Sequence, residues 1–173
     1  MNIVLIGYRG SGKTTVGQLL SARCGWAFVD TDRRIEQRAG KTIKDIFAQH
    51  GEAHFRDLER QVVAELCRED QTVISLGGGA VLDPRNQDEL SRDSLVVYLE
   101  APAEVLWDRI QQDEATTVNR PNLTTGGLEE VVQLLEARQF AYRDNADAVV
   151  DAQPSPVEVT EEIENLWQRH AKR

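Results

Sequence analysis

The sequence predicts an α/β fold, a three-layer sandwich in which helices cover both faces of a five-stranded parallel sheet. Short runs of apolar, often β-branched residues alternate along the chain with segments in which apolar residues recur at helical spacing. The short runs are almost continuously apolar, which is typical of strands buried on both faces. Strands that are separated by helical segments pair in parallel, because a parallel connection needs a crossover of a dozen or more residues.

Five runs are expected to be strands: Asn2–Ile6, Ala27–Val29, Thr72–Leu76, Leu95–Leu99 and Ala148–Val150. The pattern predicts helices over residues 16–24, Arg33–Ala39, Ile43–Gln49, Glu52–Arg68, 102–110, Leu128–Asn145 and Pro156–Arg169. Glycines mark breaks in this pattern at Gly25, Gly40 and Gly51. The polar stretch 111–127 has no periodicity, and a stretch of this kind in a compact domain indicates a lid or a disordered segment.

Composition narrows the class of protein. A chain of 173 residues is expected to form one domain, residues 1–173, with a core of its own. The net charge of -9 argues against nucleic-acid binding through a broad basic face. No apolar run is long enough to span a membrane, and Cys24 and Cys67 are expected to be reduced thiols in the cytoplasm. Since no exposed apolar face is evident, a monomer is expected.

The segment Gly7–Thr15 fits G-x-x-x-x-G-K-[ST], and it lies between a predicted strand and a predicted helix. Backbone N–H groups at such a helix start converge on phosphate, so ATP is expected to bind Gly10, Ser11, Gly12, Lys13, Thr14 and Thr15. Lys13 would reach the β- and γ-phosphates, and the Thr14 hydroxyl would bind Mg²⁺. An ordinary glycine-rich turn is the alternative. A dinucleotide site fits less well, because Thr15 stands where a third glycine belongs.

Polar residues and glycines follow the other strands. In parallel sheets ligands lie at the carboxyl ends of the strands, so residues 7–15, 30–32, 77–79 and the segment after Val150 should line one crevice. Asp30 and Asp32 would lie on one side of an extended chain. One could hold Mg²⁺ through water while the other orients or deprotonates an acceptor hydroxyl. Alternatively, Asp32 caps the following helix, and the glycines form a plain turn.

Isolated arginines are informative in an acidic chain. Arg56 and Arg138 lie in predicted helices, where a solvated role or an ion pair such as Arg56 with Glu59 is the alternative to substrate binding. Arg120 lies in the predicted lid, where an arginine could stabilise a phosphoryl group during transfer. The three histidines have no metal-ligand spacing and are expected at the surface.

Over nearly its whole length the chain resembles the shikimate kinases, a family with the P-loop, nucleoside-monophosphate-kinase-like fold. The resemblance depends on motifs in a shared order: Gly7–Thr15, Phe28–Asp32 with Ile35-Glu36, Ile46-Phe47, Gly51-Glu52, Phe55–Glu59, Gly77–Gly79, Arg120-Pro121, Arg138 and Tyr142-Arg143. It implies transfer of the γ-phosphoryl group of ATP to the 3-hydroxyl of shikimate, with Mg²⁺. The implied regions are a phosphate loop at 7–15, substrate-binding helices at about 31–68 and a lid at about 111–127.

The resemblance also implies roles for single residues. Lys13, Asp32 and Arg120 would be catalytic, and Thr14 and Asp30 would bind the metal. The substrate would be bound by Asp32, Arg56, Gly78, Gly79 and Arg138.

The family often has an arginine near the adenine shortly after the Val150-Asp151 pair, and this sequence has none there; Gln153 or Arg109 is expected to replace it. Two alternatives remain. One is another small-molecule kinase, such as a gluconate kinase, and the other is a nucleotide-binding regulatory module without an acceptor.

Overall fold

The computed structural model describes residues 1–90, 93–112 and 127–171. It contains a five-stranded sheet with the order β2-β3-β1-β4-β5, and every neighbouring pair is parallel. The strands are β1 (Asn2–Ile6), β2 (Ala27–Asp30), β3 (Thr72–Ser75), β4 (Ser94–Glu100) and β5 (Ala148–Asp151). The predicted parallel sheet and all five predicted strands are therefore confirmed.

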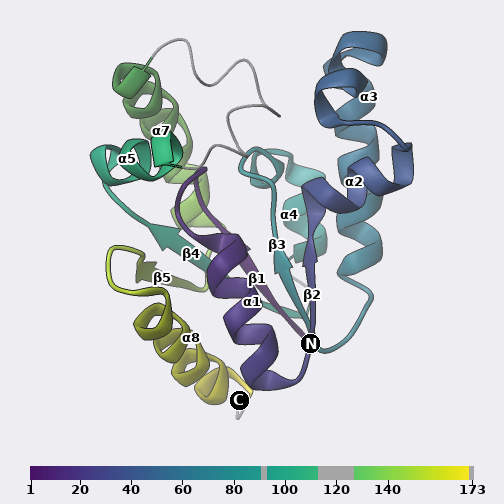
Figure 1. The fold of residues 1–173 in the computed structure, drawn as a ribbon. Coiled ribbons are helices and arrows are strands. Elements are labelled where there is room, and N and C mark those ends of the chain that lie inside the picture. The colour runs from purple at the N-terminus through teal and green to yellow at the C-terminus, as the bar shows by residue number, and fades with distance from the viewer. Residues whose placement is uncertain (91–92, 113–126, 172–173) are drawn as a thin grey trace.

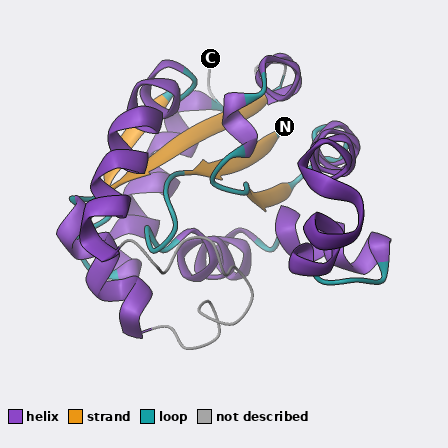
Figure 2. Cartoon of the chain, turned by 90° about the horizontal axis from the view of Figure 1, so that it is seen from above, coloured by secondary structure: helices purple, strands orange, loops and turns teal. Residues whose placement is uncertain are grey.

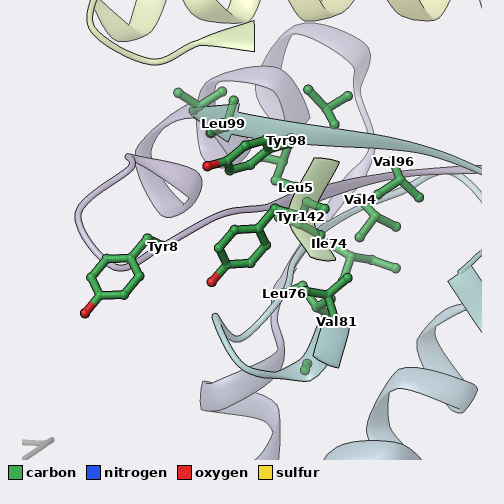
Figure 3. Packing of buried hydrophobic residues seen from close by; sticks show 14 of the residues in the cluster. Val4, Leu5, Tyr8, Ile74, Leu76, Val81, Val96, Tyr98, Leu99 and Tyr142 are labelled. Atoms are coloured by element: carbon green, nitrogen blue, oxygen red, sulfur yellow. The ribbon is translucent and has the colours of Figure 1, made fainter. Parts of the chain in front are cut away.

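The first strand lies at the centre of the sheet. Ile3 pairs with Val73 of β3 on one side and with Leu95 of β4 on the other. Every residue of β1 is buried, which explains why its sequence from Ile3 to Ile6 is continuously apolar rather than alternating. Figure 3 shows the side chains of this core between the strands and the helices.

In the described part of the chain, seven α-helices pack around the sheet or extend from its edge: α1 (Lys13–Cys24), α2 (Thr31–Ala39), α3 (Ile43–Leu66), α4 (Pro84–Leu90), α5 (Ala103–Gln112), α7 (Gly127–Asp144) and α8 (Pro156–His170). Helix α3 is interrupted at Gly51. In Figure 1, α1 and α8 cover the near face, and α4 and α7 lie behind the sheet. Viewed from above, α2 and α3 lie on one side of the molecule and α5 and α7 on the other (Figure 2).

Glycine interrupts the long helical segment where the sequence predicts a break. Gly51 has φ 78° and ψ 174°, a conformation that is not helical and that side chains with a Cβ rarely adopt. The two halves of α3 are otherwise helical, and its apolar side buries Phe55, Val62 and Leu66.

Two short helices are absent from the sequence prediction. A 3₁₀ helix η1 (Ala80–Leu82) and α4 follow the glycine turn directly. Helix α4 has seven residues, and most of them are polar, so it is too short and too polar to show apolar periodicity. The Asp83 carboxylate accepts from the Arg85 N–H at 3.0 Å, which helps to start this helix.

In the described part of the chain, no helix has the length and apolar character that a membrane crossing requires. Cys24 and Cys67 are not joined in a disulfide bond. His50 and His54 are exposed, and the described residues contain no group of three or more metal-ligating side chains.

Candidate active site

A cavity of about 540 Å³ opens at the carboxyl end of the sheet. It is lined by the loop after β1, the ends of β2 and β3, residues of α5 and α7, and the segment after β5; the lining includes Tyr8–Val16, Asp30, Asp32, Ser75–Gly78, Arg109, Arg138, Ala152, Pro154, Pro156 and Val159. All four predicted strand ends contribute to this lining. The prediction of one common crevice is confirmed.

The loop between β1 and α1 has a conformation that depends on glycine. Gly10 has φ 82°, and a Cβ at this position would lie 2.8 Å from the Leu106 carbonyl oxygen of α5. Gly12 precedes α1 with φ 91° and serves as its N-cap. The loop therefore lies closely against α5, and the residues at the start of α1, where backbone N–H groups can bind an anion, line the cavity.

Lys13 is the first residue of α1 and lines the cavity. Its ammonium group donates to the carbonyl oxygens of Gly7 at 2.8 Å and Tyr8 at 3.0 Å. These contacts hold the positive charge directly over the loop. The placement is suited to a phosphate group bound by the same loop.

Asp30 ends β2, and its two carboxylate oxygens have different partners. One oxygen accepts from the Asp32 and Arg33 N–H groups at 3.1 and 3.2 Å, which makes Asp30 the N-cap of α2. The other accepts from the Thr14 hydroxyl at 3.4 Å and the Ser75 hydroxyl at 3.1 Å. The alternative in which Asp32 caps this helix is wrong, because Asp30 performs that role.

Asp32 lies in the first turn of α2, so the expected extended chain between the two aspartates is also wrong. The helix begins one residue after Asp30 because the Asp30 cap stabilises its start. Asp32 nevertheless lines the cavity. Its carboxylate lies against the glycine turn, where a Cβ on Gly77 would come within 2.8 Å of Asp32 Oδ1.

The environment of Thr14 and Asp30 fits a magnesium ion. The Thr14 hydroxyl and the Asp30 carboxylate are oxygen ligands 3.4 Å apart, and both line the cavity beside the phosphate loop. Mg²⁺ prefers oxygen ligands, and in phosphate sites it takes one or two carboxylates together with water and phosphate oxygens. A single carboxylate with a hydroxyl is a sufficient donor set for such a site.

Arg56 lies beside the glycine turn, just outside the cavity lining. A Cβ on Gly79 would be 3.1 Å from Arg56 Nη1. The guanidinium donates to Glu59 at 2.8 Å and to Glu52 at 3.2 Å. Arg56 therefore forms the ion pair with Glu59 that was the alternative to substrate binding, and it also lies near the site. Burial by itself lowers the pKa of Arg56, but the two carboxylates raise it above its ordinary value overall. Arg56 is therefore a fixed, permanently charged group.

Arg138 approaches the same turn from α7. Its guanidinium carbon lies 5.8 Å from the centre of the Tyr8 ring, a distance typical of a cation–π contact. A Cβ on Gly78 would lie 4.0 Å from Arg138 Nη1. Arg56 and Arg138 come from helices on opposite sides of the molecule (Figure 2), and the glycine turn lies between them.

The two residues expected near the adenine differ in their placement. Arg109 lines the cavity, and its guanidinium donates to the Ala152 carbonyl at 2.8 Å and the Gly10 carbonyl at 3.5 Å. The Gln153 side chain is exposed and donates to Asp151 at 3.1 Å, so Gln153 does not line the cavity. Its backbone N–H is bonded to the same carboxylate, and this local turn directs the amide outward. Arg120 and residues 113–126 lie outside the described residues.

Several residues near the site were not predicted. Ser75 binds Asp30. Tyr8 and Arg9 line the cavity as expected for residues 7–15, but no role was predicted for either of them. Tyr142 donates from α7 to the Gly78 carbonyl at 2.6 Å. A strand-end position could have indicated Ser75. Tyr142 belongs to a motif on which the resemblance depends, but that motif assigned it no partner and no role.

Comparisons with known proteins agree with this geometry. The family model described as "Shikimate kinase" matches residues 9–167. A shikimate kinase of Nitrosococcus oceani is 44% identical over 157 residues, which cover 90% of this chain and 80% of that protein. One of Aromatoleum aromaticum is 39% identical over 175 residues, covering 100% of this chain and 98% of that protein.

Solved structures give the same result. The shikimate kinase of Acinetobacter baumannii in complex with shikimate superposes with a TM-score of 0.90 at 34% identity, covering 98% of this chain and 93% of that one. A gluconokinase of Sinorhizobium meliloti shares 17% identity at a TM-score of 0.55, covering 97% and 96% of the two chains, which shows a common fold alone. The chain belongs to the shikimate kinase family.

Proposed function

We propose that this cavity transfers the γ-phosphoryl group of ATP to the 3-hydroxyl of shikimate. One observation carries the proposal: the phosphate loop and the glycine turn line the same cavity, and Asp32 and Arg138 flank that turn. Arg56 lies beside the turn, just outside the cavity lining. Shikimate is a small carboxylate with three hydroxyl groups, so its site needs cations for one end and an acceptor for the other. The A. baumannii relative is described in complex with shikimate.

The phosphate loop would bind the triphosphate. Backbone N–H groups at the start of α1 and the Lys13 ammonium would hold the β- and γ-phosphates, which aligns the group to be transferred. Thr14 and, through water, Asp30 would hold Mg²⁺, which when bound neutralises negative charge on the phosphate oxygens. Arg109 would bind near the adenine, since its guanidinium joins the phosphate loop to the segment after β5.

The glycine turn and its neighbours would bind the acceptor. Arg56 and Arg138 would hold the carboxylate, because a planar guanidinium matches a carboxylate in a paired geometry that lysine lacks. Asp32 would accept a hydrogen bond from the attacking hydroxyl and orient it toward the γ-phosphate. Backbone groups of Gly78 and Gly79 would contact the remaining hydroxyls.

Arg120 keeps its predicted role as a cation that closes over the transferring group, and exclusion of water there would limit wasteful hydrolysis of ATP. The chain is proposed to work as a monomer in the cytoplasm, where ATP is available and the thiols of Cys24 and Cys67 would stay reduced.

An assay of ADP release tests the function. The purified chain is given ATP and Mg²⁺ with shikimate, quinate or gluconate, and without an acceptor. Release that depends on shikimate is expected. Release that depends on gluconate would support the sister-kinase alternative, and ATP binding without turnover on any acceptor would support the regulatory module.

A further inference from the structure

The glycine turn Gly77–Gly79 has six polar backbone groups, and hydrogen bonds hold four of them. The Gly77 N–H donates to the Thr31 hydroxyl at 2.9 Å, and the Gly78 carbonyl accepts from the Tyr142 hydroxyl at 2.6 Å. The Gly77 and Gly79 carbonyls accept from the N–H groups that follow in η1, at 3.0 and 3.1 Å. Side chains from α2 and α7 thus hold the turn from two sides.

Two groups of the turn remain. Among the described residues, the N–H groups of Gly78 and Gly79 have no hydrogen-bond acceptor. Both residues are only partly buried, and Arg138 approaches Gly78 while Arg56 approaches Gly79. Two adjacent donors beside two cations form a site for oxygen atoms of a small anionic ligand.

Tyr142 is placed to control these donors. Its side chain is fully buried on α7, one turn after Arg138, and it stacks on Tyr98 with ring centres 5.1 Å apart. In Figure 3 its hydroxyl points toward the turn that follows Leu76. Burial raises the pKa of Tyr142 to about 12, although nearby Arg138 lowers it, so the hydroxyl keeps its proton and acts as a donor at neutral pH.

Peptide geometry connects the hydroxyl to the free N–H. The described chain has no cis peptide bond, and in a trans peptide the C=O and the following N–H point in opposite directions. A hydrogen bond that fixes the Gly78 carbonyl therefore fixes the direction of the Gly79 N–H. Glycine has a broad range of backbone conformations, so without such a bond this peptide could rotate.

We propose that Tyr142 is a positioning residue for the acceptor substrate: its hydroxyl holds the Gly78–Gly79 peptide so that the Gly79 N–H meets a substrate oxygen beside Arg56. The inference rests on the proposed function. It adds to that function a residue that touches no substrate and acts through the backbone of the turn.

Tyr142→Phe and Tyr98→Phe form a matched pair that tests the proposal. Both remove one hydroxyl from a buried, stacked ring, but no hydrogen bond of the Tyr98 hydroxyl is seen in the described ranges. Steady-state kinetics would measure the KM for shikimate and for ATP separately, and thermal unfolding would measure stability. Tyr142→Phe should raise the shikimate KM about 10-fold, the effect of one lost hydrogen bond, with the ATP KM unchanged. Tyr98→Phe should leave both KM values at the wild-type level.

The outcomes separate the two proposals. A wild-type chain without shikimate-dependent turnover would contradict the proposed function itself. If the wild type is active and both variants behave alike, or if Tyr142→Phe lowers only the unfolding temperature, Tyr142 is structural and the inference is wrong. Should Tyr142→Phe not fold, Thr31→Val removes the other side-chain anchor of the turn. It must then show the same selective rise in shikimate KM, and unchanged kinetics would overturn the proposal.

Discussion

The two sides of the cavity are built in different ways. The phosphate side comes from nine consecutive residues, Gly7–Thr15, between one strand and the helix after it. The acceptor side comes from separate segments: Asp32 on α2, Arg56 on α3, the glycine turn after β3, and Arg138 on α7. A phosphate group can be bound by backbone N–H groups in sequence order, whereas a small polyol acid needs side chains of several kinds around it.

Because of this difference, different kinds of substitution should impair the two sides. The phosphate side depends on backbone conformation and on how α1 lies against the sheet. The acceptor side depends on individual charged groups that other residues hold in place, as Glu59 and Glu52 hold Arg56. Substitutions on the acceptor side should therefore have selective effects on one substrate, and changes beneath the phosphate loop should act through stability.

Asp32→Asn is expected to give the largest effect. If Asp32 orients the attacking hydroxyl, kcat should fall on the order of 10²–10⁴-fold while ATP still binds. Steady-state kinetics with nucleotide titration would measure both quantities. Asp57→Asn on α3, an exposed carboxylate paired with Arg60, is the matched control and should retain full activity. Near-normal turnover of Asp32→Asn would show that both sides of the cavity work mainly by binding.

Arg56→Ala should act on shikimate binding. Loss of a fixed guanidinium that holds the substrate carboxylate should raise the shikimate KM by the equivalent of about 2–5 kcal/mol, with little change in the ATP KM. Arg60→Ala, one turn further along α3 and paired with Asp57 and Asp83, is the control. Equal increases of the two KM values in Arg56→Ala would contradict the separation of the two sides.

Gly17→Ala tests how tightly α1 packs against the sheet. A Cβ on Gly17 would lie 2.5 Å from Phe28 Cε2 and 3.3 Å from Leu5 Cδ1. Such overpacking should reduce the free energy of unfolding by about 1–3 kcal/mol, which chemical denaturation can measure. Gly17→Ala combined with Phe28→Leu should recover part of the loss, because the two sites are in contact. Unchanged stability of the single variant would mean that α1 can shift freely.

The smallest expected effect is the pH dependence of stability that comes from three buried tyrosines. Burial raises the pKa of Tyr98 and of Tyr142 to about 12 and raises that of Tyr8 as well. An unfolded tyrosine ionises near pH 10 and so loses its proton first. Stability should therefore be intact below pH 10 and decrease as the pH rises from 10 toward 12.

Absorbance of tyrosinate against pH would check this order. The native chain should ionise its tyrosines above pH 10, and the chain in denaturant should do so near pH 10. Ionisation near pH 10 with native circular dichroism retained would contradict the link between the burial of these tyrosines and their raised pKa.

Local pattern alone determined much of this protein. The apolar runs predicted all five strands and their parallel pairing. The signal has a physical basis in β1, β3 and β4, which are buried almost throughout and therefore need apolar residues on both faces. The order of strand, glycine loop and helix predicted the phosphate side, since its groups are neighbours in sequence. Gly51 marked the break in α3 for a similar reason, as its backbone conformation is a local property.

Only the tertiary structure decided how the acceptor side is assembled. That Asp30 rather than Asp32 caps α2 follows from the exact residue at which the helix begins, which composition does not specify. The short polar helix α4 has no apolar period to detect. Tyr142 reaches Gly78 across 64 positions of sequence. Such a contact depends on how α7 packs against the turn after β3, and no local pattern of residues encodes that packing.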